Sequence, residues 1–299
     1  MDWELTWMEE LEGTTRRDLD SKGFWDDKVG SLLENRGFGA DMTRWQLSVL
    51  DPSENDFCIY IGCGCGRLTI PVAKMCKGIM ALDGSGPMQD ELSARVARDR
   101  ISNITVARSH WQEYEPTGRF DLTFASFSMF MRDMRCQLLR MSGCSDRCVV
   151  FASADLRIPE SAQRSVLGRI VTRYSDAEMI FGIAEDAGLE PELETEAFER
   201  EAPGDPEKTI QKLAAMCGVG SDNEELKEYV FSGQCAEDLS EVHAGAISWR
   251  NRRWMRRRAR SSACTSAGSC TSWLRPSPWC CSCHGRSRSA PPPSPLSRS

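Results

Sequence analysis

The sequence contains no uninterrupted apolar run of about 18 residues, the length that a membrane-spanning helix needs. The first residues, Met1-Asp2-Trp3-Glu4, are acidic and lack the basic and apolar regions of a secretory signal peptide. We therefore expect no membrane segment and a cytoplasmic protein.

Cysteine is frequent, with 14 residues, but its spacing fits no common zinc-binding pattern. Cys63 and Cys65 lie inside a glycine-rich turn without the paired C-x-x-C motifs of a zinc site. Because disulfides are rare in the cytoplasm, we expect the cysteines before residue 242 to be free thiols. No metal site is predicted.

Acidic residues are absent after Glu241, although the whole chain carries a net charge of −7. The last 58 residues hold eleven arginines and no lysine, and residues 250–299 are rich in Arg, Ser, Cys and Pro. One interpretation is a disordered basic tail. The other is a shifted reading frame: Trp254-Met255 must be encoded by TGGATG, and reading from its third base gives Asp, followed by glutamates if the next arginines use AGG. Such a shift is expected to remove the last strand of the sheet.

The 299 residues, 40% of them hydrophobic, are enough to build a sizeable core. The negative net charge argues against a protein that mainly binds nucleic acid.

The most informative stretch runs from Phe57 to Asp83. An apolar run of strand length is followed by Gly62, Gly64 and Gly66, then by a helical apolar pattern, and then by a second apolar run that ends in Asp83. Glycines at such a turn allow positive φ and close approach of a ligand, and an acid after the second strand can bind a ribose. The pattern predicts a nucleoside-binding βαβ unit.

The glycine spacing separates two kinds of cofactor. A dinucleotide fingerprint is G-x-G-x-x-G, whereas here the third glycine comes one residue early and Arg67 takes its place. No Gly-Lys-Ser/Thr follows, which argues against a phosphate-binding P-loop.

Four segments in order resemble the motifs of class I S-adenosylmethionine-dependent methyltransferases. The first is Ile61-Gly62-Cys63-Gly64-Cys65-Gly66-Arg67-Leu68-Thr69, and the second is Ala81-Leu82-Asp83-Gly84-Ser85-Gly86-Pro87-Met88. The third consists of Asn103-Ile104-Thr105-Val106 with Ser109-His110-Trp111, and the fourth is Phe120-Asp121-Leu122-Thr123-Phe124-Ala125-Ser126. The resemblance covers roughly residues 55 to 155 and does not specify the substrate.

The resemblance implies S-adenosyl-L-methionine as cofactor and gives each motif a role. The glycines would pass under the methionine part, Asp83 would bind the ribose, and Ser109 to Trp111 would contact the adenine, with the flat Trp111 ring the better candidate to cover the purine. Ser126 would lie beneath the sulfonium. The implied cofactor-binding residues are Ile61, Gly62, Cys63, Gly64, Gly66, Asp83, Gly84, Met88, Ser109, His110, Trp111 and Ser126. No general base is named, and His110 is the only histidine placed near these motifs.

Tyr60 departs from the family pattern, which has an acid at this position, two residues before the first glycine, to hold the cofactor's amino group. A phenol is uncharged at neutral pH, so cofactor binding is expected to be weakened or altered. Asp56 and Asp121 are the two candidates to substitute for the missing acid.

The predicted fold is α/β, with a Rossmann-like, mostly parallel sheet, helices on both faces, an N-terminal helical layer and a helical insertion after the fifth strand. We divide the chain into an N-terminal helical cap (1–50), the cofactor-binding core (51–157), a C-terminal helical, substrate-side region (158–249) and the basic tail (250–299). Within the third part we expect one long helix over 158–186 and a strand over 191–202.

The expected function is methyl transfer to an unidentified acceptor, a small molecule or protein rather than a nucleic acid. Two alternatives stay open: a nucleotide-dependent oxidoreductase on the same fold, and a degenerate domain that binds cofactor or partner without turnover. No oligomeric state is predicted.

Overall fold

The computed structural model describes residues 1–12, 23–30, 39–200 and 204–251, which all belong to one compact unit, Met1–Arg256. Within those residues, every helix is too short or too polar to span a bilayer. Both interpretations of the basic tail concern residues that lie almost entirely outside the described ones.

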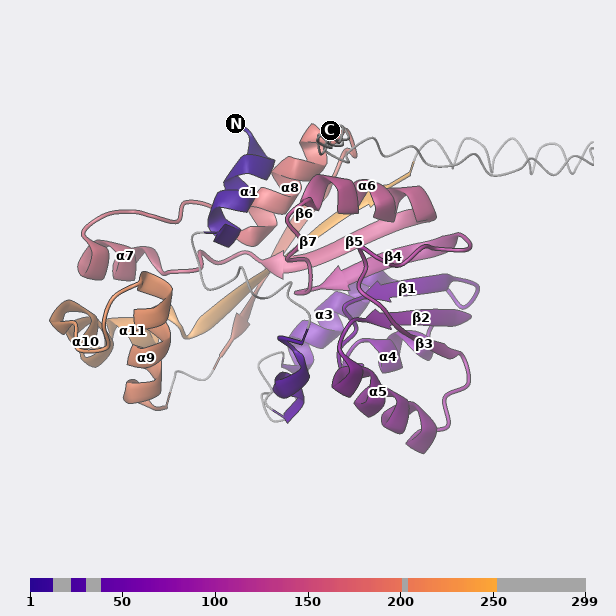
Figure 1. Cartoon of the computed structure of the whole chain (residues 1–299), viewed down its shortest axis with the longest axis horizontal. Coiled ribbons are helices and arrows are strands. Elements are labelled where there is room, and N and C mark those ends of the chain that lie inside the picture. Colours follow the sequence, from indigo (N-terminus) through magenta and orange to yellow (C-terminus); the bar gives the residue numbers. More distant parts are fainter. Residues whose placement is uncertain (13–22, 31–38, 201–203, 252–299) are drawn as a thin grey trace, which may run out of the picture. The chain divides into compact units, whose positions relative to one another are not determined.

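A seven-stranded sheet in the order β3-β2-β1-β4-β5-β7-β6 forms the centre of this unit (Figure 1). All neighbouring strands are parallel except β7, which runs antiparallel to both β5 and β6. The prediction of a Rossmann-like, mostly parallel sheet is confirmed. The strands are β1 (Phe57–Ile61), β2 (Gly78–Asp83), β3 (Ile104–Arg108), β4 (Phe120–Ser126), β5 (Ser145–Ser153), β6 (Glu192–Glu199) and β7 (Glu241–Arg250).

Helices cover both faces of the sheet, because successive strand residues point to opposite sides and both sets are apolar. In β1, Ile59 and Ile61 face one buried cluster, whereas Cys58 and Tyr60 face the other. Figure 1 shows α1 (Trp3–Glu12), α6 (Met134–Cys144) and α8 (Asp176–Asp186) over the first face. The second face is covered by α3 (Ala40–Leu50), α4 (Thr69–Ala73) and α5 (Gly86–Arg98).

The described N-terminal helices therefore pack on opposite faces of the sheet. On α1, Trp7 is buried and its indole N–H donates to the carbonyl oxygen of Met131 at 2.8 Å. On α3, Leu50 is buried in the second cluster. Between them lies the short 3-10 helix η2 (Asp26–Lys28).

The region after β5 contains a separate helical cluster, as the sequence predicted. It consists of α7 (Glu160–Leu167), α9 (Pro206–Cys217), α10 (Glu224–Phe231) and α11 (Gln234–Asp238), which share their own buried residues. The predicted single helix over 158–186 is wrong: α7 ends at Gly168, whose φ is 63°, and α8 starts at a capping box formed by Ser175 and Glu178.

Strand β7 was not predicted from the sequence, and its presence corrects one expectation. The last strand is inserted beside β5 and ends at Arg250, so a change of reading frame after roughly residue 250 would not remove it. Its alanines and glycine are weak strand formers, and pairing with two neighbours holds them in the sheet.

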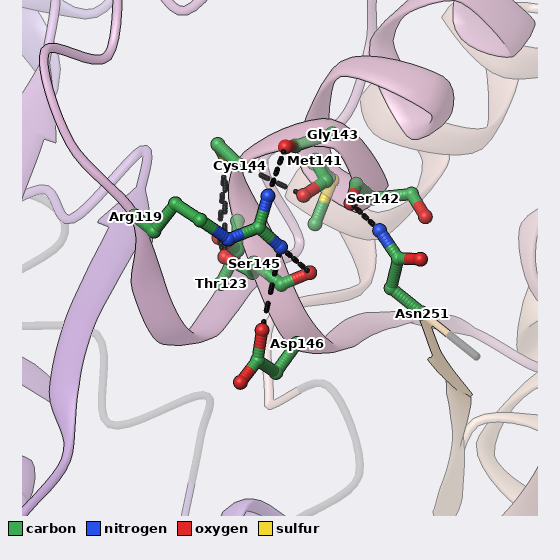
Figure 2. A network of polar contacts seen from close by, with 9 residues as sticks. All are labelled: Arg119, Thr123, Met141, Ser142, Gly143, Cys144, Ser145, Asp146 and Asn251. Carbon is green, nitrogen blue, oxygen red and sulfur yellow. Dashed lines mark hydrogen bonds and ion pairs between the residues drawn. The ribbon is translucent and has the colours of Figure 1, made fainter. Parts of the chain in front are cut away.

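The junction between α6 and β5 has no connecting residues, because Cys144 ends the helix and Ser145 starts the strand. The last carbonyl groups of a helix need donors from elsewhere. Arg119 donates to the carbonyl oxygen of Gly143 at 3.0 Å, and the Asn251 side chain donates to that of Ser142 at 2.6 Å (Figure 2). This network holds the start of β5 in place, at the end of the sheet opposite to the carboxyl ends of the parallel strands.

Gly182 provides a test of how α1 docks on α8. A Cβ at Gly182 would lie 2.4 Å from ring atoms of Trp3. In an isolated helix Gly→Ala stabilises by about 0.5–1 kcal/mol, whereas forced overpacking costs about 1–3 kcal/mol. We expect Gly182→Ala to lower the free energy of unfolding in the intact chain and to raise it in a Trp3→Ala background, as measured by urea denaturation. Stabilisation in both backgrounds would contradict the packing of Trp3 on α8.

Candidate functional site

The turn after β1 is shaped by its three glycines. Gly62, Gly64 and Gly66 have φ of 69°, 50° and 88°, a left-handed range that favours glycine. A Cβ at Gly62 would lie 2.3 Å from Ser128, and one at Gly66 would lie 2.4 Å from Leu92. At Gly64, no heavy atom of the described residues lies within 4 Å of that position. The backbone at Gly64 is therefore open to a ligand.

Asp83 connects this turn to the next one. Its Oδ2 accepts from the backbone N–H of Gly64 at 2.8 Å, and its Oδ1 accepts from that of Ser85 at 2.9 Å. Burial raises the pKa of Asp83 above its ordinary value, and the two backbone hydrogen bonds oppose that shift. Since an ionised carboxylate accepts about four hydrogen bonds, acceptor capacity remains for a ligand.

The turn between β2 and α5 is crossed by two side chains from the end of β3. A Cβ at Gly84 would lie 2.4 Å from the His110 ring, and one at Gly86 would lie 2.2 Å from the Arg108 guanidinium. The Ser109 backbone N–H donates to the carbonyl oxygen of Asp83 at 3.0 Å. The structure thus brings Asp83, Gly84, Ser109 and His110 together.

Asp26 is a residue of this site that the sequence analysis missed. Its carboxylate accepts from the Ser85 hydroxyl at 2.6 Å, and Ser85 is also the N-cap of α5. Asp26 lies 59 residues earlier in the chain, in the short η2 helix, and no local pattern marks it.

Trp111 does not occupy the predicted position over a purine. Its side chain is only 2% exposed in the core of the α1, α6 and α8 face, with the Arg140 guanidinium 4.8 Å from its ring centroid. No open ring face is left for an adenine, which corrects the sequence-based preference for Trp111 over His110. Met88 is also buried, with its sulfur 3.3 Å from Cys65 Sγ.

Ile61 and Cys63 support the turn from beneath. The Ile61 carbonyl oxygen accepts from the Ser128 hydroxyl at 2.8 Å. Cys63 is buried, and burial raises the pKa of its thiol well above the ordinary value, so the group stays protonated. The described residues contain no group of three or more possible metal ligands.

Tyr60, which replaces the family's acid, is part of the core. Its ring stacks on Phe124 with 4.4 Å between centroids, and it is only 4% exposed. Burial raises the pKa of Tyr60 to about 12, although the nearby Arg67 lowers it. Tyr60 is therefore neutral, and the charge beside it is positive.

Arg67 lies in a polar network at the carboxyl end of β4. Its guanidinium donates to Thr43 at 2.9 Å, to Gln46 at 2.7 Å and to Ser126 at 3.2 Å. Gln46 in turn donates to Ser126 at 3.0 Å. Helix α3 thus supplies two of the groups that position this half-buried cation, and no local sequence pattern marks them.

A cavity of about 120 Å³ begins next to Ser126. Phe127 has a φ of 52°, a conformation that costs a residue with a Cβ of the order of 1–2 kcal/mol, and its N–H donates to Phe151 at 2.9 Å. The cavity is lined by Phe127, Met129, Phe130, Phe151, Ala152, Ser153, Asp176 and Ile180.

His110 is not the only histidine at this edge of the sheet, and that expectation is wrong. His243 pairs with Asp155, which follows the carboxyl end of β5, with 2.7 Å between Nδ1 and Oδ1. Because β7 is antiparallel to β5, its first residues reach the edge where the parallel strands end.

Comparison with known proteins gives a family for the central segment. Residues 59–141 match a family model described as a methyltransferase domain. A segment of 79 residues is 29% identical to the 23S rRNA (uracil(1939)-C(5))-methyltransferase RlmD of Aliivibrio fischeri, covering 26% of this chain and 18% of that protein. An uncharacterized protein of Haemophilus influenzae is 23% identical over 135 residues, covering 44% of this chain and 50% of its own length.

The chain thus spans half or less of the length of these curated relatives. Among solved structures, the YcgJ protein from Bacillus subtilis aligns with a TM-score of 0.48 and 12% identity, covering 70% of this chain and 97% of that chain. Phosphoethanolamine N-methyltransferase 2 from Haemonchus contortus aligns with a TM-score of 0.47 and 16% identity, covering 71% and 52%. The family match confirms the methyltransferase resemblance over residues 59–141.

Alanine substitutions at two glycines test the geometry of the turn after β1. Gly66→Ala adds a Cβ against the fully buried Leu92 at a positive φ, and we expect a loss of about 2–4 kcal/mol of unfolding free energy from strain and overpacking. Gly118→Ala is the matched control, because no described heavy atom lies within 4 Å of its added Cβ. Equal losses in urea denaturation would show that the Gly66 contact does not set the turn.

Proposed function

We propose that this chain, whose residues 59–141 form a methyltransferase domain, transfers a methyl group from S-adenosyl-L-methionine to a small-molecule acceptor. The observation that carries the proposal is the position of Asp83, whose carboxylate joins the glycine turn after β1 to the turn after β2. In a parallel sheet the ligand lies at the carboxyl ends of the strands, where both turns are found.

The described residues fit this cofactor. The open backbone at Gly64 leaves room for a ligand against the turn, and Asp83 keeps acceptor capacity for two ribose hydroxyl groups. His110, half-buried against Gly84, is better placed than Trp111 to contact the adenine.

The family pattern has a negative charge at the position of Tyr60, whereas here the nearby Arg67 makes this part of the site positive. A half-buried guanidinium is suited to a carboxylate, because a charged hydrogen bond between them is strong in a partly dry site. We therefore assign Arg67 to the carboxylate of the cofactor's methionine part.

The bound cofactor supplies an electrophilic methyl group, so the protein's task is to position the acceptor and to exclude water. The cavity beside Phe127 is mostly apolar, with Ser153 and Asp176 as its polar residues, which suits a small molecule. The chain's net charge of −7 disfavours a nucleic-acid acceptor.

Replacing Asp83 tests the cofactor site. Asp83→Ala removes an ionised acceptor, and hydrogen bonds to charged groups are worth about 1.5–3 kcal/mol. We expect isothermal titration calorimetry to show S-adenosylhomocysteine binding weakened by about 10- to 150-fold.

Asp90→Ala, an exposed acid on the following helix α5, is the matched control and should bind normally. A parallel titration with NAD tests the alternative that the protein is a nucleotide-dependent oxidoreductase. Unchanged affinity of Asp83→Ala for S-adenosylhomocysteine, or tight binding of NAD by the wild type, would contradict the proposal.

The raised pKa of Asp83 predicts a pH dependence. The carboxylate binds ribose hydroxyls as an acceptor only when ionised, and burial moves its protonation above the ordinary value of 3.8. As pH falls, affinity for S-adenosylhomocysteine should therefore drop at a higher pH than an ordinary aspartate would give. Calorimetry across pH should show this acid limb in the wild type and not in Asp83→Asn. An identical limb in both proteins would assign it to another group.

A further inference from the structure

Asp155 and His243 form a two-point contact between the loop after β5 and the first residues of β7. Asp155 Oδ1 lies 2.7 Å from His243 Nδ1, and Oδ2 accepts from the backbone N–H of His243 at 2.8 Å. Since an ionised carboxylate only accepts, Nδ1 carries the hydrogen and Nε2 keeps its lone pair. The pair therefore presents a basic nitrogen in a fixed orientation.

The ring is also accessible. The His243 side chain is 43% exposed and that of Asp155 is 39% exposed. Glu241 is the nearest other acid, with Oε2 at 3.9 Å from Nε2. This distance is longer than a hydrogen bond, but it allows the carboxylate to stabilise a positive charge on the ring.

The pair stands beside the cavity at the carboxyl ends of β4 and β5. Ser153 lines the cavity and pairs in register with Ala244, the residue after His243. The next backbone hydrogen bond, from Ala154 to the carbonyl oxygen of His243, is 2.9 Å long. His243 is thus the residue of β7 next to Ala244, which pairs with the cavity-lining Ser153.

Strand alternation places His243 on the α8 side of the sheet. It shares a face with Gly245 and Ile247, because side chains two residues apart point the same way. A Cβ at Gly245 would lie 2.6 Å from Ala177 Cβ, and the neighbouring Asp176 lines the cavity. His243 and the cavity therefore lie on the same face of the sheet, at the carboxyl ends of the parallel strands.

We propose that His243 is the general base of the transfer, that Asp155 positions it, and that the acceptor is a phenol-type hydroxyl compound. This inference rests on the proposed methyltransferase function. Three aromatic rings of the cavity wall, from Phe127, Phe130 and Phe151, suit a flat aromatic acceptor. A neutral hydroxyl is a weak nucleophile and gains from losing its proton in the transition state.

The acceptor oxygen forms a bond to the methyl carbon while the sulfur–methyl bond breaks. The hydroxyl proton passes to His243 Nε2, and the positive charge lost by the sulfonium ends on the imidazolium beside Asp155 and Glu241. The products are the methyl ether and S-adenosylhomocysteine, and the proton then leaves to solvent.

The experiment compares the full-length wild type with His243→Gln, Asp155→Asn and the control Glu237→Gln, an exposed acid on α11. Calorimetry with S-adenosylhomocysteine comes first and should give the same affinity for all four proteins. Transfer of labelled methyl groups from S-adenosylmethionine to catechol and 4-nitrophenol is then measured, with benzylamine as the amine probe.

We expect His243→Gln to lower kcat for the phenols by about 10²- to 10⁴-fold, the usual contribution of a general base. Asp155→Asn should also slow the reaction. In addition, it should shift the ¹⁵N resonances of the His243 ring away from the Nδ1–H tautomer, which a purely structural role would not do. Glu237→Gln should match the wild type.

Three results would overturn the inference while leaving the proposed function intact: phenol methylation unaffected by His243→Gln, methylation of benzylamine alone, or no transfer to either phenol by a protein that binds S-adenosylhomocysteine. Failure of the wild type to bind S-adenosylhomocysteine would instead overturn the proposed function itself.

Discussion

The site depends on one carboxylate held by two backbone N–H groups. Asp83 accepts from Gly64 and from Ser85, and these bonds fix the turns after β1 and β2 relative to each other. Each turn is further constrained, the first by Ser128 and Leu92 packed where side chains would be, the second by His110 and Arg108. The start of the first turn is also tied to β2 by the N–H groups of Gly62 and Cys63, which donate to the Leu82 carbonyl oxygen. Without the carboxylate, Gly64 and Ser85 would lose the acceptor that they share.

A second constraint acts at the neighbouring strand end. Tyr60 replaces the family's acid, and its ring is buried against Phe124, so this position supports the core and carries no charge. Arg67 supplies charge of the opposite sign and is held by Gln46 and Thr43 from α3. A polar network around Arg67 therefore lies beside the uncharged Tyr60, and α3 in the N-terminal region helps to build it.

Local patterns predicted the strands other than β7, the glycine turn and the position of Asp83, because each depends on residues close together in the sequence. Contacts between distant residues left no such signal. Asp155 and His243 are 88 residues apart and meet only because β7, rich in alanine and glycine, pairs antiparallel with β5. The burial of Trp111 also escaped prediction, since an aromatic ring fits a core as well as a ligand site.

We propose that the cofactor lies against the glycine turn and Asp83. Backbone amide resonances report this directly when S-adenosylhomocysteine is added to isotope-labelled protein. We expect the largest chemical-shift changes at Gly64 and Ser85. The resonances of Gly118 and Gly168, where an added Cβ would meet no described heavy atom within 4 Å, should stay unchanged. Shifts centred elsewhere, or none at saturating ligand, would contradict it.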